Sequence, residues 1–403
     1  MAKLKNINGH FVESDYEDAL ISFLEREGWQ YLFGDSISRA NRKEVLYMDD
    51  LLQFLKDINK NVKDEELQRI ADNVRLVGAD TDFATLHKVY KRMVDGVSAV
   101  DKDGRPTTVN LIDFTCLDNP LNDNKNIFRV VNQFTVDYIN NGVNQNRRPD
   151  VLLYVNGMPI CVIELKNPTD AKATIYDAWE QINIRYWRDI PGLLHYCPLA
   201  CISDGVKTRL GTVRTPYEHF YAWRRVENGD KVSTMPFDEL ETMVKGVYRP
   251  ERFLEIFRDY VYFQDENYDS DEKEIVCRYP QFFATRMLRE SVIKSVKTKS
   301  GKGGTYFGAT GCGKTYTMAF LARQLSMRCA AEIGSPTILM IVDREDLQKQ
   351  GAKLFTKSTE FLGLGEVSVV PSRKVLREEL SLRDSGGFFI CTIRNFVTGK
   401  KTR

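Results

Sequence analysis

Residues that could support metal-dependent hydrolysis occur in the stretch RPDVLLYVNGMPICVIELKNP, residues 148–168. Asp150 opens one apolar run, and Glu164 and Lys166 lie at the end of the next. Two converging carboxylates bind a hard divalent cation, normally Mg²⁺, through their oxygens. Such a cation polarises a phosphodiester and acidifies an attacking water, while a lysine beside it orients that water and balances charge. The stretch therefore predicts a Mg²⁺ site that hydrolyses phosphodiesters.

A purely structural role is the alternative for two of these residues. Glu164 and Lys166 are two apart in an apolar run, so on a strand they point to the same side and could form an ion pair. A buried carboxylate costs several kcal/mol unless a cation compensates it. The ion pair does not explain why Asp150 opens the preceding run, whereas a metal site explains all three residues.

The elements that must position these residues are two strands joined at Asn156-Gly157, a pair that tolerates positive φ and favours a tight hairpin turn. With a strict two-residue loop, Asp150 would lie opposite Ile163 and face away from Glu164. A shared site therefore requires one additional residue in the hairpin, as a three-residue loop or a β-bulge. Because proline cannot donate to the ladder, we predict the irregularity at Pro159, where the second strand starts.

A second stretch, Gly308–Thr315 (GATGCGKT), matches the phosphate-loop pattern G-x-x-x-x-G-K-[ST]. We expect TYF before it to be a strand and TYTMAFLARQL after it to be a helix. The glycines, with Thr310 in the loop, let backbone N–H groups wrap phosphates at a helix N-terminus. Lys314 would reach the β- and γ-phosphates, and Thr315 would hold Mg²⁺. A glycine-rich turn with an accidental lysine is the structural alternative. The predicted ATP-binding residues are Gln281, Gly308, Thr310, Gly311, Gly313, Lys314 and Thr315.

The remaining pattern predicts two domains. Residues 13–100 have mostly helical periodicity. Residues 107–136 alternate short β-rich stretches, such as VNLIDF and FRVVNQFTV, with turns. We expect a helix around residues 175–186 and a strand at residues 199–203. The acidic stretch QDENYDSDEKE, residues 264–274, predicts a linker. We assign residues 1–248 to the first domain (core about 107–215), 249–276 to a connecting helix and linker, and 277–403 to a nucleotide-binding α/β domain.

Composition narrows the class of protein. The chain has 403 residues, 42% hydrophobic and 28% charged residues and a net charge of +1, as expected for an ordinary globular protein. It has no apolar run long enough to span a membrane and no signal-peptide pattern, so we expect a cytoplasmic protein. The eight scattered cysteines are expected to be reduced. Cys197 and Cys201 lie near His195, but their spacing fits core packing better than a zinc site.

The motifs resemble known families. Pro149-Asp150 followed by Glu164-Leu165-Lys166 is similar to the PD-(D/E)xK nuclease superfamily. The order of motifs along nearly the whole chain resembles the restriction (R) subunit of type I restriction-modification enzymes. The similar blocks are DYEDALISFLEREGW, the hairpin, AWEQINIRYWRDIPGLLHYCPLACISDG, RFLEIFRDYVYF, RYPQFFA, the phosphate loop, IVDREDLQKQ and TIRNF. The resemblance implies an α/β protein: a restriction-endonuclease-like domain with a helical N-terminal part, then a partial RecA-like parallel-sheet domain of a superfamily 2 helicase-like motor.

The resemblance also implies roles for individual residues. Asp150 and Glu164 would bind the metal, Lys166 would complete the catalytic set, and Glu17 matches an acidic position that often joins such sites. Gln181 matches a Q-x-x-x-Y element that helps to hold DNA, but Tyr186 is five residues away, one more than the family spacing. Positions four apart share a helical face better than positions five apart. Gln281 corresponds to a glutamine that reads adenine.

The implied function is Mg²⁺-dependent endonucleolytic cleavage of double-stranded DNA, coupled to ATP-driven translocation, in a complex with modification (M) and specificity (S) subunits. S-adenosylmethionine would enter only through the M subunit. Because no DEAD-like Walker B box follows Thr392, we expect a fragment of a longer protein that has lost ATP hydrolysis and cleaves weakly or not at all by itself. The alternatives are a nuclease-helicase of another system, such as a type III restriction subunit, and a catalytically inert ATP- and DNA-binding scaffold.

Overall fold

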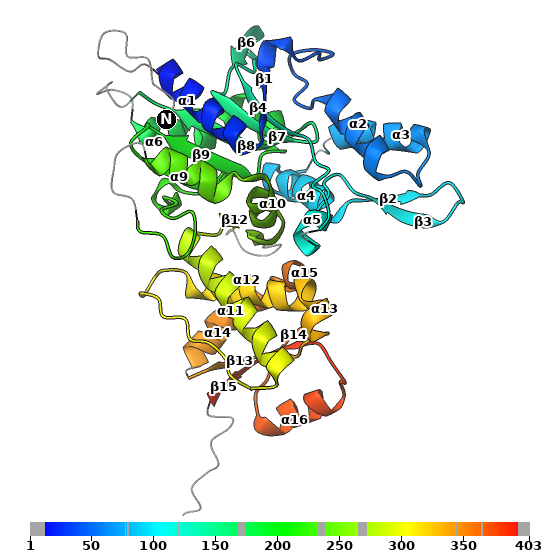
Figure 1. Cartoon of the computed structure of the whole chain (residues 1–403), viewed down its shortest axis with the longest axis vertical. Coiled ribbons are helices and arrows are strands. Elements are labelled where there is room, and N and C mark those ends of the chain that lie inside the picture. Colours follow the sequence, from blue (N-terminus) through cyan, green and yellow to red (C-terminus); the bar gives the residue numbers. More distant parts are fainter. Residues whose placement is uncertain are drawn as a thin grey trace, which may run out of the picture. The chain divides into compact units, whose positions relative to one another are not determined.

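The chain divides into two compact units, one of residues 1–261 with 274–276 and one of 262–273 with 277–403 (Figure 1). The computed structural model describes residues 13–76, 78, 80–119, 121–167, 174–232, 238–264, 272–343, 345–363 and 366–393. Most of the expected acidic linker, residues 265–271, lies outside the described residues, between β11 (Val261–Gln264) and β12 (Lys273–Val276). Among the described helices, none is both long and apolar enough to cross a bilayer.

A six-stranded mixed sheet forms the centre of the first unit. The strands run in the order β1-β4-β7-β8-β9-β10. The β1–β4 and β8–β9 pairs are parallel and the other neighbours are antiparallel. In chain order, the strands are β1 (Gln30–Phe33), β4 (Phe128–Asn132), β7 (Val151–Val155), β8 (Met158–Leu165), β9 (Leu199–Ser203) and β10 (Thr208–Thr212).

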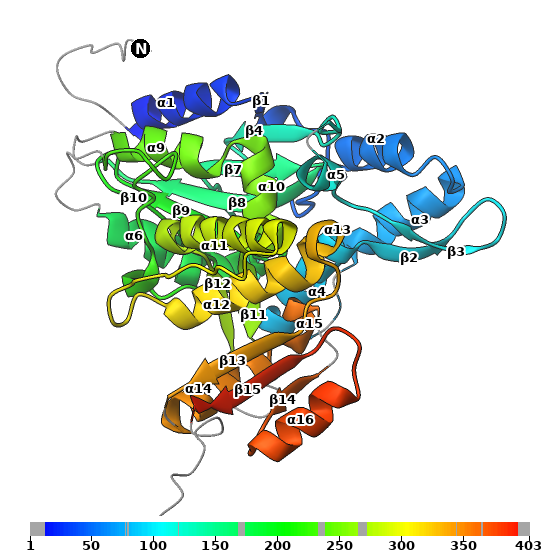
Figure 2. The same ribbon diagram turned by 60° about the horizontal axis from the view of Figure 1, so that its bottom comes forward.

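The two central strands, β7 and β8, are buried along their whole length, because their nearly continuous apolar runs are covered on both faces. Helices α1 and α9 pack against each other; α1 also contacts β4 and β8, and α9 contacts β10 (Figure 2). The helices of this unit are α1 (Glu13–Arg26), α2 (Met48–Ile58), α3 (Asp64–Arg75), α4 (Asp82–Asp95), α5 (Thr115–Asp118), α6 (Ile175–Glu180), α7 (Trp187–Asp189), α8 (Pro191–Leu194), α9 (Asp238–Val247) and α10 (Pro250–Asp259), with the short 3-10 helices Gly34–Ser36 and Tyr217–His219.

The helical periodicity predicted for residues 13–100 is confirmed by α1 to α4, but β1 interrupts it and residues 97–100 form a strand. Helix α10 was expected to belong to a connector, but it is part of the first unit. Its apolar face is buried there: the Phe253 ring lies 5.4 Å from that of Trp29, and the Tyr90 hydroxyl donates to the Phe257 carbonyl at 2.8 Å.

Two antiparallel ribbons are separate from the main sheet. β2 (Val97–Val100) pairs with β3 (Pro106–Val109), and β5 (Val136–Asn140) pairs with β6 (Val143–Arg147). The stretch VNLIDF was expected to be a strand, but β3 ends at its first residue. Beyond that point the Asp113 N–H donates to the Asn126 side chain (2.8 Å) instead of to a neighbouring strand. FRVVNQFTV is divided between β4 and β5, because Gln133 has a positive φ of 53° that breaks the extended backbone.

The second unit contains a three-stranded parallel sheet in the order β13-β15-β14, as expected for a nucleotide-binding α/β domain. Thr305–Phe307 was expected to be a strand before the phosphate loop, but it has no ladder partner among the described residues, and Phe307 is 93% exposed. The elements of this unit are α11 (Tyr279–Thr298), α12 (Lys314–Arg323), the π-helix Gln324–Arg328, α13 (Ala330–Ile333), β13 (Ile338–Val342), α14 (Glu345–Thr356), α15 (Thr359–Leu362), β14 (Val367–Val369), α16 (Arg373–Ser381) and β15 (Phe388–Thr392).

Candidate active site

The β7–β8 hairpin contains the predicted irregularity. Near the turn Tyr154 pairs with Pro159, whereas towards the other end Val151 pairs with Ile163, so the register shifts by one residue. Ile160 is the additional residue, directly after Pro159, and the bulge prediction is confirmed. The turn itself is a two-residue loop in which Asn156 and Gly157 have φ values of 51° and 76°. Continued by one position, the shifted register places Asp150 opposite Glu164.

Asp150 and Glu164 form a closely coupled carboxyl pair. The N–H of Leu165 donates to Asp150 Oδ2 at 2.7 Å, which fixes this carboxyl against the end of β8. Glu164 is fully buried. Burial, followed by the charge of Asp150, raises the pKa of Glu164 well above its usual range. Burial also raises the pKa of Asp150, opposed by the hydrogen bond from Leu165 and by the charge of Lys166. Without a cation, the pair therefore retains a proton more readily than an exposed pair.

One oxygen of Glu164 is left for a ligand. Oε1 accepts a hydrogen bond of 2.6 Å from the Tyr186 hydroxyl, whereas the buried Oε2 accepts none from the described residues. Lys166 Nζ lies 3.8 Å from Oε2, beyond hydrogen-bonding distance, and donates instead to the Leu165 carbonyl at 2.9 Å. The ion pair that a structural role would require is present, but it does not satisfy this oxygen. Two carboxylates with an unpaired buried oxygen fit a hard divalent cation.

The segment that carries Gln181 and Tyr186 is a π-helix, residues Gln181–Tyr186, between α6 and α7. A π-turn contains about one residue more than an α-turn, so residues five apart share a face. Gln181 Nε2 donates to the Tyr186 hydroxyl at 2.8 Å, and that hydroxyl donates to Glu164. The α-helical rule that separated Gln181 from Tyr186 does not hold here. The structure brings both residues to the carboxyl pair.

Glu17 lies at the same end of the sheet but is not directly bonded to the pair. It is buried in α1, where its Oε1 accepts hydrogen bonds from the side chains of Asn132 (2.5 Å) and Gln133 (3.2 Å). Asn132 ends β4 and pairs with Val151, which is next to Asp150. Glu17 therefore supports the β4 end beside the site. Sequence reasoning missed the two amides, because no spacing rule links a helix to a strand end so far along the chain.

Two further contacts near the site were not predicted. The Lys166 N–H donates to the Ser203 carbonyl at 2.8 Å, which ties Lys166 to the end of β9. Arg147 Nη2 lies 2.6 Å from Asp189 Oδ2, joining the end of β6 to α7. The hydrogen bond from Arg188, together with those from Arg147, lowers the pKa of Asp189 to about 2 despite its burial. The one sequence feature that pointed to the Arg147 contact was the basic pair Arg147-Arg148 before Pro149.

The phosphate loop of the second unit precedes α12, whose first residue is Lys314. Lys314 Nζ donates to the carbonyls of Gly308 (2.8 Å) and Ala309 (2.9 Å), so the ammonium folds back over the loop. Gly313 caps the helix with a φ of 83°. The buried Gln281 donates to the Gly313 carbonyl at 3.1 Å. Gly311 has a φ of 80°, and Thr310 and Thr315 lie in the loop and in the first turn of α12. Gln281 thus contacts the last glycine of the predicted loop.

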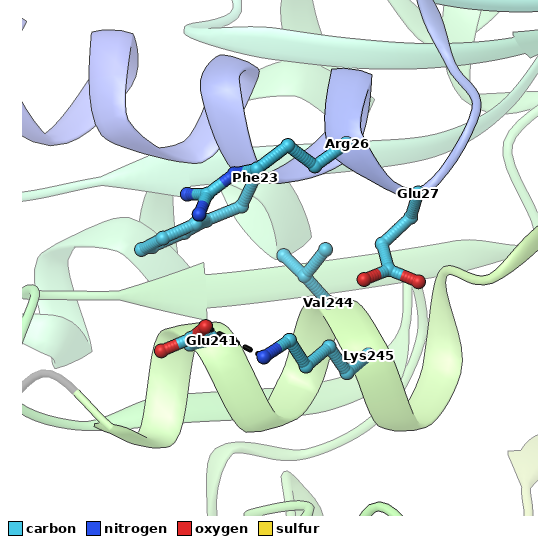
Figure 3. Close-up of a pocket in the computed structure, with 6 residues that line it drawn as sticks. All are labelled: Phe23, Arg26, Glu27, Glu241, Val244 and Lys245. Carbon is cyan, nitrogen blue, oxygen red and sulfur yellow. Dashed lines mark ion pairs between the residues drawn. The ribbon is translucent and has the colours of Figure 1, made fainter. Parts of the chain in front are cut away.

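Two further features of the first unit are a set of buried thiols and a small pocket. Cys197 and Cys201 are buried free thiols, as predicted, and the described residues contain no cluster of three or more metal-ligating side chains. A small pocket lies between α1 and α9 (Figure 3). One wall carries the Glu241–Lys245 ion pair at 2.7 Å. The residues that line the pocket are Phe23, Arg26, Glu27, Glu241, Val244 and Lys245. Neither residue of the carboxyl pair is among them.

Two family models match the chain. Residues 10–219, a little more than half of the chain, match the type I restriction enzyme R protein N terminus. The chain therefore belongs to this family. Residues 280–403 match the SWI2/SNF2 ATPase model, in agreement with the phosphate loop and the parallel sheet of the second unit.

Curated relatives agree with this classification. A putative type I restriction enzyme MjaIXP endonuclease subunit of Methanocaldococcus jannaschii is 28% identical over 97% of this chain and 38% of its own length. The type I restriction enzyme HindI endonuclease subunit of Haemophilus influenzae is 26% identical over 96% of this chain and 37% of its own length. The chain thus spans less than two fifths of the length of these relatives.

Proposed function

We propose that the first unit is a Mg²⁺-dependent endonuclease of the PD-(D/E)xK type, acting within the restriction subunit of a type I restriction-modification enzyme. The observation that carries this proposal is the bulge at Ile160, because it brings Asp150 opposite Glu164. Without the additional residue the two carboxyls would point to opposite faces of the sheet. Family membership and the names of the relatives support the same function.

Asp150 and Glu164 would hold the metal ion, with Glu164 Oε2 as the oxygen that no described residue satisfies. A bound Mg²⁺ would supply a Lewis acid that polarises the phosphodiester and lowers the pKa of a water. Burial raises the pKa of Glu164, so a metal ion would bind this carboxyl more tightly as the pH rises, because only the ionised carboxylate is a ligand.

The other side chains have supporting roles in this proposal. Lys166, whose ammonium lies 3.8 Å from Glu164 Oε2, balances charge and orients the attacking water. Tyr186 occupies Glu164 Oε1 and so directs Oε2 towards the metal, and Gln181 fixes the Tyr186 hydroxyl. Glu17 holds the end of β4 through Asn132.

In the second unit we assign Gly308, Thr310, Gly311, Gly313, Lys314 and Thr315 to ATP binding, with Gln281 at the adenine. Lys314 would exchange its two loop carbonyls for phosphate oxygens when nucleotide binds. In the complete enzyme, the motor would translocate double-stranded DNA at the expense of ATP while M and S subunits hold the recognition site. Phosphate contacts and groove shape would then suffice for the nuclease, so its DNA affinity should fall steeply with salt.

Plasmid cleavage by the assembled complex of full-length R, M and S subunits tests the proposal. With Mg²⁺ and ATP, the wild type should cut, and Asp150→Ala should abolish cutting. Asp103→Ala, which removes an exposed carboxylate in the β2–β3 turn, is the matched control and should cut as the wild type does. Undiminished cutting by Asp150→Ala would refute the catalytic assignment. Absence of cutting by the wild-type complex would favour an inert ATP- and DNA-binding scaffold.

A further inference from the structure

The β5–β6 ribbon, residues 136–147, stands at the catalytic end of the main sheet. β4 and β7 are antiparallel neighbours, and the pair Asn132–Val151 closes their ladder beside Asp150. A tight turn would suffice to connect two such strands. The chain instead forms a separate two-stranded ribbon at this end (Figure 1). The last residue of the ribbon, Arg147, is three positions from Asp150 in the chain.

The outer part of the ribbon is exposed on both faces. Every residue from 139 to 146 is exposed, and the tip turns at Asn141 and Gly142, which have φ values of 50° and 78°. The sequence NNGVNQNRR supplies amide groups in place of the charges usual on an exposed strand. Asn144 and Asn146 are two apart in β6 and so project from the same face, together with Ile139, the partner of Asn144.

The base of the ribbon is held rigidly. Arg147 binds Asp189 of α7, and its guanidinium lies 5.6 Å from the Tyr138 ring centre. The Tyr138 hydroxyl donates to Gln145 Oε1 at 2.7 Å, which ties the two strands together on the opposite face from Asn144. α7 directly follows the π-helix that contributes Tyr186. The ribbon is therefore fixed relative to the carboxyl pair.

Cationic side chains surround this base. The Asp137 N–H donates to the Arg42 carbonyl at 3.1 Å, which places the exposed residues Arg42 and Lys43 beside the start of β5. Arg148, directly after β6, is exposed. Asp137 is the one acidic residue between positions 133 and 149.

We propose that the β5–β6 ribbon enters the major groove of the duplex next to the phosphodiester that is cut, while Arg42, Lys43 and Arg148 contact the flanking phosphates. The major groove is wide enough for a two-stranded ribbon, and asparagine amides match the donors and acceptors of its base edges. Amides and cations suit DNA better than a protein partner, because protein-binding surfaces depend on buried aromatic and apolar anchors. This inference rests on the proposed nuclease function.

Site-directed crosslinking tests the placement. An Asn144→Cys variant in the Asp150→Ala background should exchange with a duplex that carries a tethered mixed disulfide on cytosine N4, in the major groove, and so displace the small leaving thiol. Ser98→Cys, at an exposed position of the β2–β3 ribbon, is the matched control, and the unsubstituted chain reports the background from Cys312. Trapping no greater than in these controls, or trapping only by a minor-groove tether on guanine N2, would overturn the proposal.

Binding measurements provide an independent test. The double variant Asn144→Asp, Asn146→Asp should bind a short fluorescent duplex about tenfold more weakly, as expected for the loss of good base-edge contacts. Arg105→Asp makes the same change of net charge on the β2–β3 ribbon and should bind as before. The proposal would be overturned if the double variant bound the duplex with unchanged affinity. It would also be overturned if the double variant lost assembly with the M and S subunits and not DNA affinity. Because no cleavage is needed, these results are separate from the test of the nuclease.

Discussion

The hydroxyl of Tyr186 donates a 2.6 Å hydrogen bond to Glu164 Oε1, across 22 residues of sequence and between two buried side chains. Burial and the charge of Glu164 raise the pKa of Tyr186 well above its usual range, so the tyrosine remains a donor at any physiological pH. It thereby occupies one oxygen of the carboxylate and leaves the other, Oε2, available to the proposed metal ion.

Replacing Tyr186 with phenylalanine should weaken metal use. Partners that orient a metal-ligating group are worth roughly 10- to 100-fold in metal affinity or activity. We therefore expect the Mg²⁺ concentration for half-maximal plasmid cleavage by the complex to rise by about that factor. Tyr176→Phe is the control, because Tyr176 lies in the preceding helix but is 47% exposed. An unchanged Mg²⁺ dependence would show that Tyr186 only fills space.

The π-helix should behave as a one-residue insertion. Deleting Ile184, which is 47% exposed, should convert the segment to an α-helix in which Gln181 and the tyrosine are four apart and still share a face. Cleavage by the complex should then be retained. Inserting an alanine after Ile184 should instead rotate the tyrosine by a further 100° or so and abolish cleavage. The opposite pattern, with loss on deletion and retention on insertion, would contradict this account of the helix.

The buried carboxylate should make metal-free stability depend on pH. A carboxyl whose pKa is raised on folding stabilises the protein at low pH, and this contribution is lost as pH rises from the ordinary value of 4.5 through the raised pKa. In EDTA, the free energy of unfolding should therefore fall as the pH rises above about 4.5. Glu164→Gln should reduce this slope, leaving the parts due to Asp150 and Glu274, whose pKa values burial also raises. Equal slopes for the wild type and Glu164→Gln in urea denaturation would contradict the assignment.

Lys314 should contribute directly to nucleotide affinity. A charge-assisted hydrogen bond is worth about 1.5–3 kcal/mol, so Lys314→Ala should weaken binding of a fluorescent ATP analogue by roughly 10- to 100-fold. Lys302→Ala, at an exposed position before the loop, should bind normally. Equal affinities for all three chains would mean that the lysine does not reach the phosphates.

The site could be predicted from the sequence where a requirement was geometric. Asp150 and Glu164 can meet only if the hairpin gains a residue, and Pro159 indicated where, so the bulge could be placed before the structure was known. The π-helix could not be predicted in this way. An α-helical period assigns Gln181 and Tyr186 to different faces, and no local sequence feature indicates the additional residue. Tertiary contacts decide such a helix, through the bond from Tyr186 to Glu164.

The errors in the fold that was predicted from the sequence have a related cause. Thr305–Phe307 has strand-forming residues, but a strand requires a ladder partner, which local sequence does not show. The position of α10 depended on the contact between Phe253 and Trp29, which are far apart in the chain. Local propensity predicted which segments could form helices or strands. Long-range packing determined which of these segments did form them.

The proposed nuclease requires Asp150 and Glu164 to bind one divalent cation jointly. Titration of the nucleotide-free chain with Mn²⁺, followed by the electron paramagnetic resonance of the free ion, measures this directly. The wild type should show a binding site that is lost in both Asp150→Ala and Glu164→Gln. Retention of that site in either variant would contradict the claim, because one carboxylate would then be sufficient without the other.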